Sequence, residues 1–222
     1  MKRVMRKISA LCAGVLLLGT LAACSQFDAS GYVKAILDNS YYNDATGIVE
    51  QEIGTAEEAA AIYEQGIEAQ VATVNAELEI SDALTEEYRQ FFKDLYASVK
   101  YTVGEAVEVD KETLEVTVTY EKMYVFTEAV VTYQAKLTEM AEVWTEAALA
   151  GEEVPTDEQM NEQLFAILKD CLKAELAEAS YDAPTTMTIR VQLIDNVWTP
   201  NQEDLLNLEY SLFDFEGLYE MQ

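Results

Sequence analysis

The spacing of hydrophobic residues changes several times along this 222-residue chain, and these changes limit the folds that it can adopt. Between residues 29 and 95, apolar side chains recur every three or four positions, as on one face of a helix. Between residues 101 and 120 they alternate with polar or small residues, as in a half-buried strand. Helical spacing returns over residues 126–174, alternation over 187–193, and helical spacing again over 205–212. This order predicts an α+β fold, with helices packed on a small antiparallel sheet of three to four strands.

Several of the expected helices begin with a capping signal. Asp28 is a suitable N-cap for a helix over residues 29–41, and Ser81 is a suitable N-cap for a helix lined by aromatic residues. Three patterns are typical of capping boxes, the last with Pro200 at the first helical position: Thr55 with Glu58, Thr156 with Gln159, and Thr199 with Gln202.

The alternating stretch is interrupted by Asp110-Lys111-Glu112, which is typical of a turn and therefore predicts a β-hairpin. Gly104 is a candidate bulge in the first strand. We expect one face of that first strand to carry Tyr101, Val103, Val107 and Val109.

Two long helical stripes between the strands predict an antiparallel helical hairpin. Apolar residues step alternately by four and three from Phe126 to Ala147, and again from Met160 to Ala174, with a connection at residues 151–155. Such stripes also suit a dimer seam, but they are shorter than a sustained coiled coil. We therefore expect them to pack within the domain.

The first 24 residues have the organisation of a secretory signal. Lys2, Arg3, Arg6 and Lys7 form a basic start, and residues 8–20 follow as a largely apolar, uncharged run. This run is too short for a stable transmembrane helix, which needs about 20 apolar residues. It ends in Leu21-Ala22-Ala23-Cys24.

Leu21-Ala22-Ala23-Cys24 resembles the bacterial lipobox. In that family the cysteine thiol receives a diacylglycerol, and a dedicated signal peptidase recognises the preceding residues and cuts before the cysteine. The resemblance implies a lipoprotein signal peptide at residues 1–23 and an acylated N-terminus and short tether at 24–28. The sequence has no repeat and no linker rich in Pro or Gly, with only 3 Pro and 9 Gly in all, so we expect residues 29–222 to form a single α+β domain. It also implies attachment to the cell membrane on the extracytoplasmic face, through a covalent lipid at Cys24. The alternative is an ordinary signal peptide followed by a chance cysteine.

The acidic charge of the chain restricts its partners. Without the four basic leader residues it has 41 acidic against 10 basic side chains, a net charge of −31. Such a body is repelled by nucleic acid and by anionic membrane surfaces, so we expect no nucleic-acid partner. Divalent cations, cationic peptides or a basic protein face remain open.

Histidine is absent from the chain, which excludes a Ser-His-Asp triad, a Cys-His pair and an HExxH zinc site. No nucleotide-binding or SxxK motif is present, so we expect no cofactor and no catalytic residue. Once the leader is removed and Cys24 acylated, Cys171 is the remaining thiol, and its place on an apolar stripe predicts a buried core position.

Three groups of residues are weaker candidates for a site. The loop over residues 38–47 is rich in oxygen ligands but lacks the EF-hand order, so a turn is expected rather than a calcium site. Adjacent acids could form a glycosidase pair, although solvated helix faces are the simpler interpretation. These pairs are Glu57/Glu58, Glu86/Glu87 and Glu152/Glu153. Tyrosines could line a groove for sugars or peptides or could fill the core. These are Tyr41/Tyr42, Tyr120/Tyr124 and Tyr181.

Residues 27–38, 97–103 and 202–205 are similar to a group of uncharacterised lipoproteins of Gram-positive gut bacteria. The resemblance implies an α+β fold of the cystatin or nuclear-transport-factor-two-like kind, in which helices pack on a curved antiparallel sheet. The group has no established activity, so the resemblance transfers no catalytic residue, and the long helical hairpin departs from a compact version of the fold.

These observations favour a non-enzymatic, lipid-anchored domain that binds an unknown small molecule, glycan or protein of the cell envelope. One alternative is an acid-pair carbohydrate hydrolase of the envelope. Another is the substrate-binding lipoprotein of a transporter, which usually has two lobes of alternating strands and helices.

Overall fold

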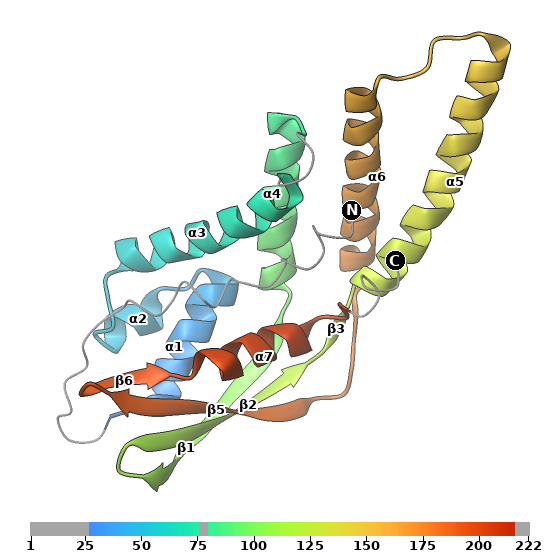
Figure 1. Cartoon of the computed structure of the whole chain (residues 1–222). Coiled ribbons are helices and arrows are strands. Elements are labelled where there is room, and N and C mark those ends of the chain that lie inside the picture. Colours follow the sequence, from blue (N-terminus) through green and yellow to red (C-terminus); the bar gives the residue numbers. More distant parts are fainter. Residues whose placement is uncertain (1–26, 76–79, 216–222) are drawn as a thin grey trace.

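The computed structural model describes residues 27–75 and 80–215, and within them helices cover one face of a small sheet (Figure 1). The predicted cleavage and lipidation residues, Leu21 to Cys24, lie outside these ranges. The helices are α1 (Ala29–Tyr42), α2 (Thr46–Glu50), α3 (Ala56–Asn75), α4 (Asp82–Ala97), α5 (Phe126–Ala150), α6 (Asp157–Ala177) and α7 (Gln202–Leu212). The strands are β1 (Lys100–Asp110), β2 (Thr113–Glu121), β3 (Met123–Tyr124), β4 (Ser180–Tyr181), β5 (Thr185–Ile194) and β6 (Val197–Pro200). No helix within the described ranges combines the length and the hydropathy needed to cross a bilayer.

The main sheet has four antiparallel strands in the order β1-β2-β5-β6, and a second sheet pairs β3 with β4. In the register, Val118 of β2 lies between Val103 of β1 and Met187 of β5, so the three residues share one face. Val116, Ile189 and Val191 on this face are fully buried, since α1 and α7 pack on it. The predicted α+β class, the β-hairpin and the antiparallel sheet are therefore confirmed.

The bulge predicted at Gly104 is confirmed, because the pairing of β1 with β2 shifts between Val103 and Ala106. The extra residue reverses which side chains face the core, since a shift of one position exchanges the two faces of a strand. Val107 therefore lies on the face opposite Val103, and a second register shift between Glu108 and Asp110 affects Val109. Residues 104–110 are all exposed, Val107 and Val109 by 62% and 55%, so the prediction that these two valines share the face of Tyr101 and Val103 is wrong.

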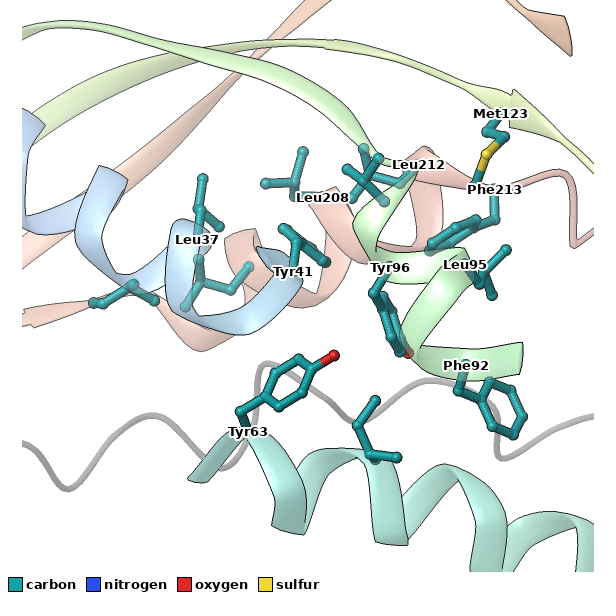
Figure 2. Close-up of a cluster of buried hydrophobic side chains, with 14 of the residues drawn as sticks. Leu37, Tyr41, Tyr63, Phe92, Leu95, Tyr96, Met123, Leu208, Leu212 and Phe213 are labelled. Atoms are coloured by element: carbon teal, nitrogen blue, oxygen red, sulfur yellow. The ribbon is translucent and has the colours of Figure 1, made fainter. Parts of the chain in front are cut away.

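The buried hydrophobic side chains of the described residues form one cluster, which lies between the sheet and the helices. Figure 2 shows its centre, where Tyr41 of α1, Tyr96 of α4 and Phe213 after α7 lie close together. The rings of Tyr41 and Tyr96 are 5.9 Å apart, and those of Tyr96 and Phe213 are 6.0 Å apart at a steep angle. Edge-to-face contacts of this kind add to the free energy of burial.

Cys171 is buried among apolar residues of α6, as predicted, and burial raises the pKa of its thiol.

The helix starts follow the capping signals with one exception. The side chains of Asp28 and Ser81 cap α1 and α4, and the boxes at Thr55 and Thr156 are present. The predicted box at Thr199 is wrong. Pro200 pairs with Val191 in β6, and the side chain of Asn201 caps α7 instead. The short strand β6 occupies the residues that would have opened the helix.

Helices α5 and α6 form the predicted hairpin, which we call the arm. They lie close together near β3 and separate toward their connection (Figure 1). Buried residues of α5 end at Tyr133, and the later stripe residues Leu137 and Trp144 are half-buried. On α6, Cys171 is buried but Ala174 is exposed. Packing within the domain therefore holds for the base of the arm and not for its outer half.

Candidate functional site

A pocket of about 690 Å³ opens where the end of β2, the start of β5 and the second half of α7 meet. Its volume lies within the range of about 300–1,000 Å³ that is usual for small-molecule sites. Its lining is mostly polar and includes two aromatic rings. The lining residues are Tyr120, Lys122, Asp182, Ala183, Thr185, Asn207, Tyr210 and Ser211.

The sheet positions one wall of this pocket. Tyr120 of β2 is the register partner of Thr185 of β5, so both lie at the same end of the strand pair. The backbone N–H of Asp182 donates to the carbonyl oxygen of Lys122 at 2.9 Å, which holds the two charged residues on neighbouring segments. The hydroxyl of Tyr124 donates to Oδ2 of Asp182 at 2.9 Å, and this hydrogen bond raises the pKa of Tyr124.

Helix α7 forms the opposite wall, and Asp204 fixes its position. One guanidinium group, that of Arg190 on β5, donates to both carboxylate oxygens of Asp204 at 2.7 Å. The backbone N–H of Arg190 donates to Oδ2 at 3.0 Å. Burial disfavours the Asp204 carboxylate, but these hydrogen bonds outweigh burial and hold its pKa below the ordinary value. Asn207, Tyr210 and Ser211 thereby lie along the pocket.

Asp204→Asn is expected to lower the free energy of unfolding at neutral pH by about 2 kcal/mol, because Arg190 loses a charged acceptor. The loss is moderate since the Arg190 side chain is 42% exposed and partly screened by water. The folded pKa of Asp204 lies below the unfolded value of about 3.9, so its contribution is present above that pH and disappears as the pH falls through the folded pKa. The free energy of unfolding, measured with denaturant from neutral to acidic pH, should fall less steeply with decreasing pH in the variant than in the parent. We call this part of the curve the acid limb. An acid limb as steep as that of the parent would contradict this assignment, and Asp195→Asn in an exposed turn is the matched control.

The pocket lining offers aromatic, charged and hydrogen-bonding groups. Tyr210 is 44% exposed, and its ring makes a T-shaped contact with Phe215 at 6.1 Å between centroids, so part of the aromatic side chain is open to a ligand. Lys122 and Asp182 offer charges of opposite sign, and Asn207 and Ser211 offer amide and hydroxyl groups. Asp182 is the one carboxyl group among its lining residues, whereas a glycosidase needs two.

The predicted tyrosines lie in three places, and one of these is the pocket. Tyr120 lines it, and Tyr124 contacts its rim through Asp182. Tyr41 is fully buried in the core, so it cannot line a groove. Tyr42 and Tyr181 lie in a separate cluster where the end of α1 meets the start of β1.

This second cluster is held by contacts within the protein. Tyr42 stacks on Tyr101 at 5.4 Å, and the hydroxyl of Tyr101 donates to Oδ1 of Asp38 at 2.5 Å. Burial and the Asp38 contact raise the pKa of Tyr101 far above its ordinary value. The hydroxyl of Tyr181 donates to the carbonyl of Ser98 at 2.8 Å, under Lys100. The cluster therefore anchors α1 to the sheet.

Two of the three adjacent acid pairs contain residues that make contacts within the fold. Glu58 accepts hydrogen bonds from Thr55 that lower its pKa, the opposite of what a general acid needs. Glu86 pairs with Arg89 on the same helix, and Glu87 pairs with Lys169 of α6. Residues 152–153 are exposed in the connection of the arm.

The oxygen-rich loop is also used internally. Asp38 contacts Lys34 and Tyr101, and Oδ1 of Asp44 accepts from the backbone N–H of Thr46 at 2.9 Å, as in an Asx turn. Asn43 ends α1 in the left-handed conformation. Within residues 27–75 and 80–215, no three Asp, Glu or Cys side chains gather as metal ligands.

Most of the pocket was missed by sequence reasoning. Lys122 and Asp182 lie in short segments that carry no motif, and Tyr210 is on the outer side of an apolar helix stripe. These residues come together only in the fold, which brings side chains up to about 90 positions apart in the sequence to one pocket.

Comparison with known proteins supports the architecture. The structure of the candidate lipoprotein ycdA from Bacillus subtilis superposes with a TM-score of 0.50 at 10% sequence identity. The match covers 85% of this chain and 57% of that protein, so this chain spans little more than half of its length. At this identity the likeness concerns the fold. No protein-family model matches the chain, and the search of curated proteins found no match.

Proposed function

We propose that the chain is a lipid-anchored extracytoplasmic lipoprotein whose domain binds a small polar ligand of the cell envelope without converting it. The lipid would be carried by Cys24, after cleavage by a signal peptidase that recognises Leu21, Ala22 and Ala23. The basic leader and its short apolar run support this anchor. The fold likeness to a candidate lipoprotein supports it further. Each buried acyl CH₂ contributes about 0.8 kcal/mol, and two chains suffice for stable attachment.

The observation that carries the binding function is the pocket beside α7, whose lining combines the partly exposed Tyr210 with a set of polar groups. An aromatic face and hydrogen-bonding side chains suit the apolar face and hydroxyls of a sugar. The net charge of −31 disfavours polyanionic ligands at long range. We therefore propose neutral or zwitterionic glycan fragments of the envelope as the ligand class.

The alternative functions have less support. A hydrolase would need a second carboxyl group near Asp182, and a transporter's binding protein usually has two lobes of alternating strands and helices. The described residues instead share one antiparallel four-stranded sheet and one core cluster.

Tyr210→Ala is expected to weaken the binding of such a glycan about tenfold, or about 1.4 kcal/mol, because the stacking surface is lost. Calorimetric titration of the purified protein with oligosaccharide fragments of the cell wall measures the effect, and chromatography of the same samples detects any product. Val143→Ala, which removes part of an exposed side chain (62%) on the arm, away from the pocket, is the control. Equal weakening by both variants would contradict the assigned site. Release of shortened glycans would contradict the non-enzymatic function.

A further inference from the structure

The first described residue, Phe27, lies at the end of the sheet that holds the β1–β2 turn. The ring of Phe27 stacks on Trp198 of β6 at 5.2 Å with an angle of 4° between the planes, and contacts Tyr32 of α1 at 5.3 Å. A depression of about 460 Å³ joins Phe27 and Trp198 to Lys111 and Leu114 at the β1–β2 turn. The start of the domain is therefore packed against the turn end of the sheet.

The distance from this point to the proposed lipid is short. Three Cα–Cα steps separate Cys24 from Phe27, and they span at most about 11 Å when fully extended. If Cys24 carries the lipid, the turn end of the sheet must stay close to the bilayer. The arm extends from the other end of the sheet (Figure 1), so the same tether directs the arm away from the membrane.

Three exposed aliphatic side chains lie at this turn end, and we call them the aliphatic patch. They are Val107, Val109 and Ile194, with exposed fractions of 62%, 55% and 52%. Val107 and Val109 precede the β1–β2 turn, and Ile194 precedes the β5–β6 turn. Strands β1 and β5 both pair antiparallel to β2, so the two turns lie at the same end of the sheet.

We propose that the aliphatic patch is the surface with which the anchored domain contacts the lipid bilayer, an inference that rests on the proposed lipidation of Cys24. The tether keeps this end of the sheet near the interface, and contact with the interface removes part of the exposed aliphatic surface from water. The outer part of the arm, where most side chains are exposed, is then presented to the cell exterior.

The charge of the turn end opposes close contact with anionic lipid. Glu108, Asp110 and Glu112 flank the turn, against a single base at Lys111. Repulsion acts within about a Debye length, roughly 8 Å at physiological salt. Contact is therefore expected to be closest on zwitterionic phosphatidylcholine, and to weaken on anionic vesicles at low salt but recover at high salt.

Site-specific fluorescence tests the orientation. The full lipoprotein, purified from membranes with its native N-terminus, is labelled through Val109→Cys or, as a control, through Leu149→Cys at the tip of the arm, where the native side chain is 84% exposed. Cys171 is buried and the Cys24 thiol is occupied by lipid, so the new cysteine takes the fluorophore. In phosphatidylcholine vesicles with a headgroup spin label, quenching at position 109 should be several-fold greater than at 149.

A matched pair of variants tests the patch itself. Val107→Ser with Ile194→Ser should reduce quenching at position 109, whereas Val131→Ser with Val143→Ser on the arm should leave it unchanged. Flotation of the vesicles distinguishes a failure of the lipid anchor from a failure of the proposed orientation. A chain that does not float with the vesicles contradicts the lipid anchor and, with it, the proposed orientation. A chain that floats with equal quenching at both positions contradicts the orientation alone, and unchanged quenching in the patch variant contradicts the role of the patch.

Discussion

A chain with serine in place of Cys24 is expected to lose its covalent lipid completely. The lipobox family joins its lipid through a cysteine thioether, and a serine hydroxyl does not take its place in that reaction. A body with a charge of −31 is repelled by an anionic membrane surface, so charge offers no attachment in place of the lipid. We expect the Cys24→Ser precursor to lack lipid and to remain uncleaved by the lipoprotein signal peptidase.

Fractionation of expressing cells, with metabolic labelling by a fatty acid, measures this effect. The parent chain should carry the label and stay in the membrane fraction after an alkaline wash, while Cys24→Ser carries none. Cys171→Ser is the matched control, because that thiol is buried in the core and should not affect lipidation. Fatty-acid label on the Cys24→Ser chain would contradict the anchor, as would equal membrane retention of mature, cleaved chains.

Asp214→Ala is expected to cause the largest loss of stability among the substitutions considered. Helix α5 begins without a cap from its own segment, since Val125 offers no side-chain acceptor. Asp214, which is 1% exposed, supplies one from the C-terminal segment. Its Oδ1 accepts from the N–H groups of Val125 and Phe126 at 3.0 and 2.9 Å, and its Oδ2 accepts from Thr127 at 2.7 Å. Alanine would leave three N–H groups unpaired at the positive end of the helix.

An unsatisfied buried donor costs about 1–3 kcal/mol, so we expect a loss of at least about 3 kcal/mol. In a domain of this size, that corresponds to a fall of about 6–12 °C in the melting temperature. Calorimetry or circular dichroism measures the change. Asp214→Asn retains one acceptor oxygen and should lose roughly half as much. A melting temperature of Asp214→Ala equal to that of the parent would contradict this role of the carboxylate.

Local sequence signals predicted much of the fold because they act over a few residues. The caps at Asp28, Ser81 and Thr156 each satisfy a donor three residues away, so their spacing is visible in the sequence. The alternation over β2 and β5 survives in the structure because both strands are central and bury one face.

The errors occurred where a distant contact or a single inserted residue decided the outcome. The bulge after Val103 was predicted, but Val107 was still assigned to the same strand face as Val103, although one extra residue places it on the opposite face. The strand β6 was missed although Asp195 and Asn196 both take positive φ, as a tight hairpin turn between Ile194 and Val197 requires. That pair of residues was a usable signal.

The candidate site was less predictable than the fold. Tyr120 was named because aromatic residues on a strand are visible in the sequence, whereas Asp182 and Tyr210 reach the pocket only through packing. The position of α7 depends on the contact of Asp204 with Arg190, and the start of α5 depends on Asp214. Contacts across 14 and almost 90 residues leave no periodic trace in a single sequence.

Mass spectrometry of the N-terminal peptide from protein purified out of its native host tests the lipidated cysteine most directly. We expect a first residue at position 24, with the mass of a diacylglycerol attached to its sulfur. A peptide that begins elsewhere, or a free thiol at that position, would remove the anchor and with it the proposed orientation on the membrane.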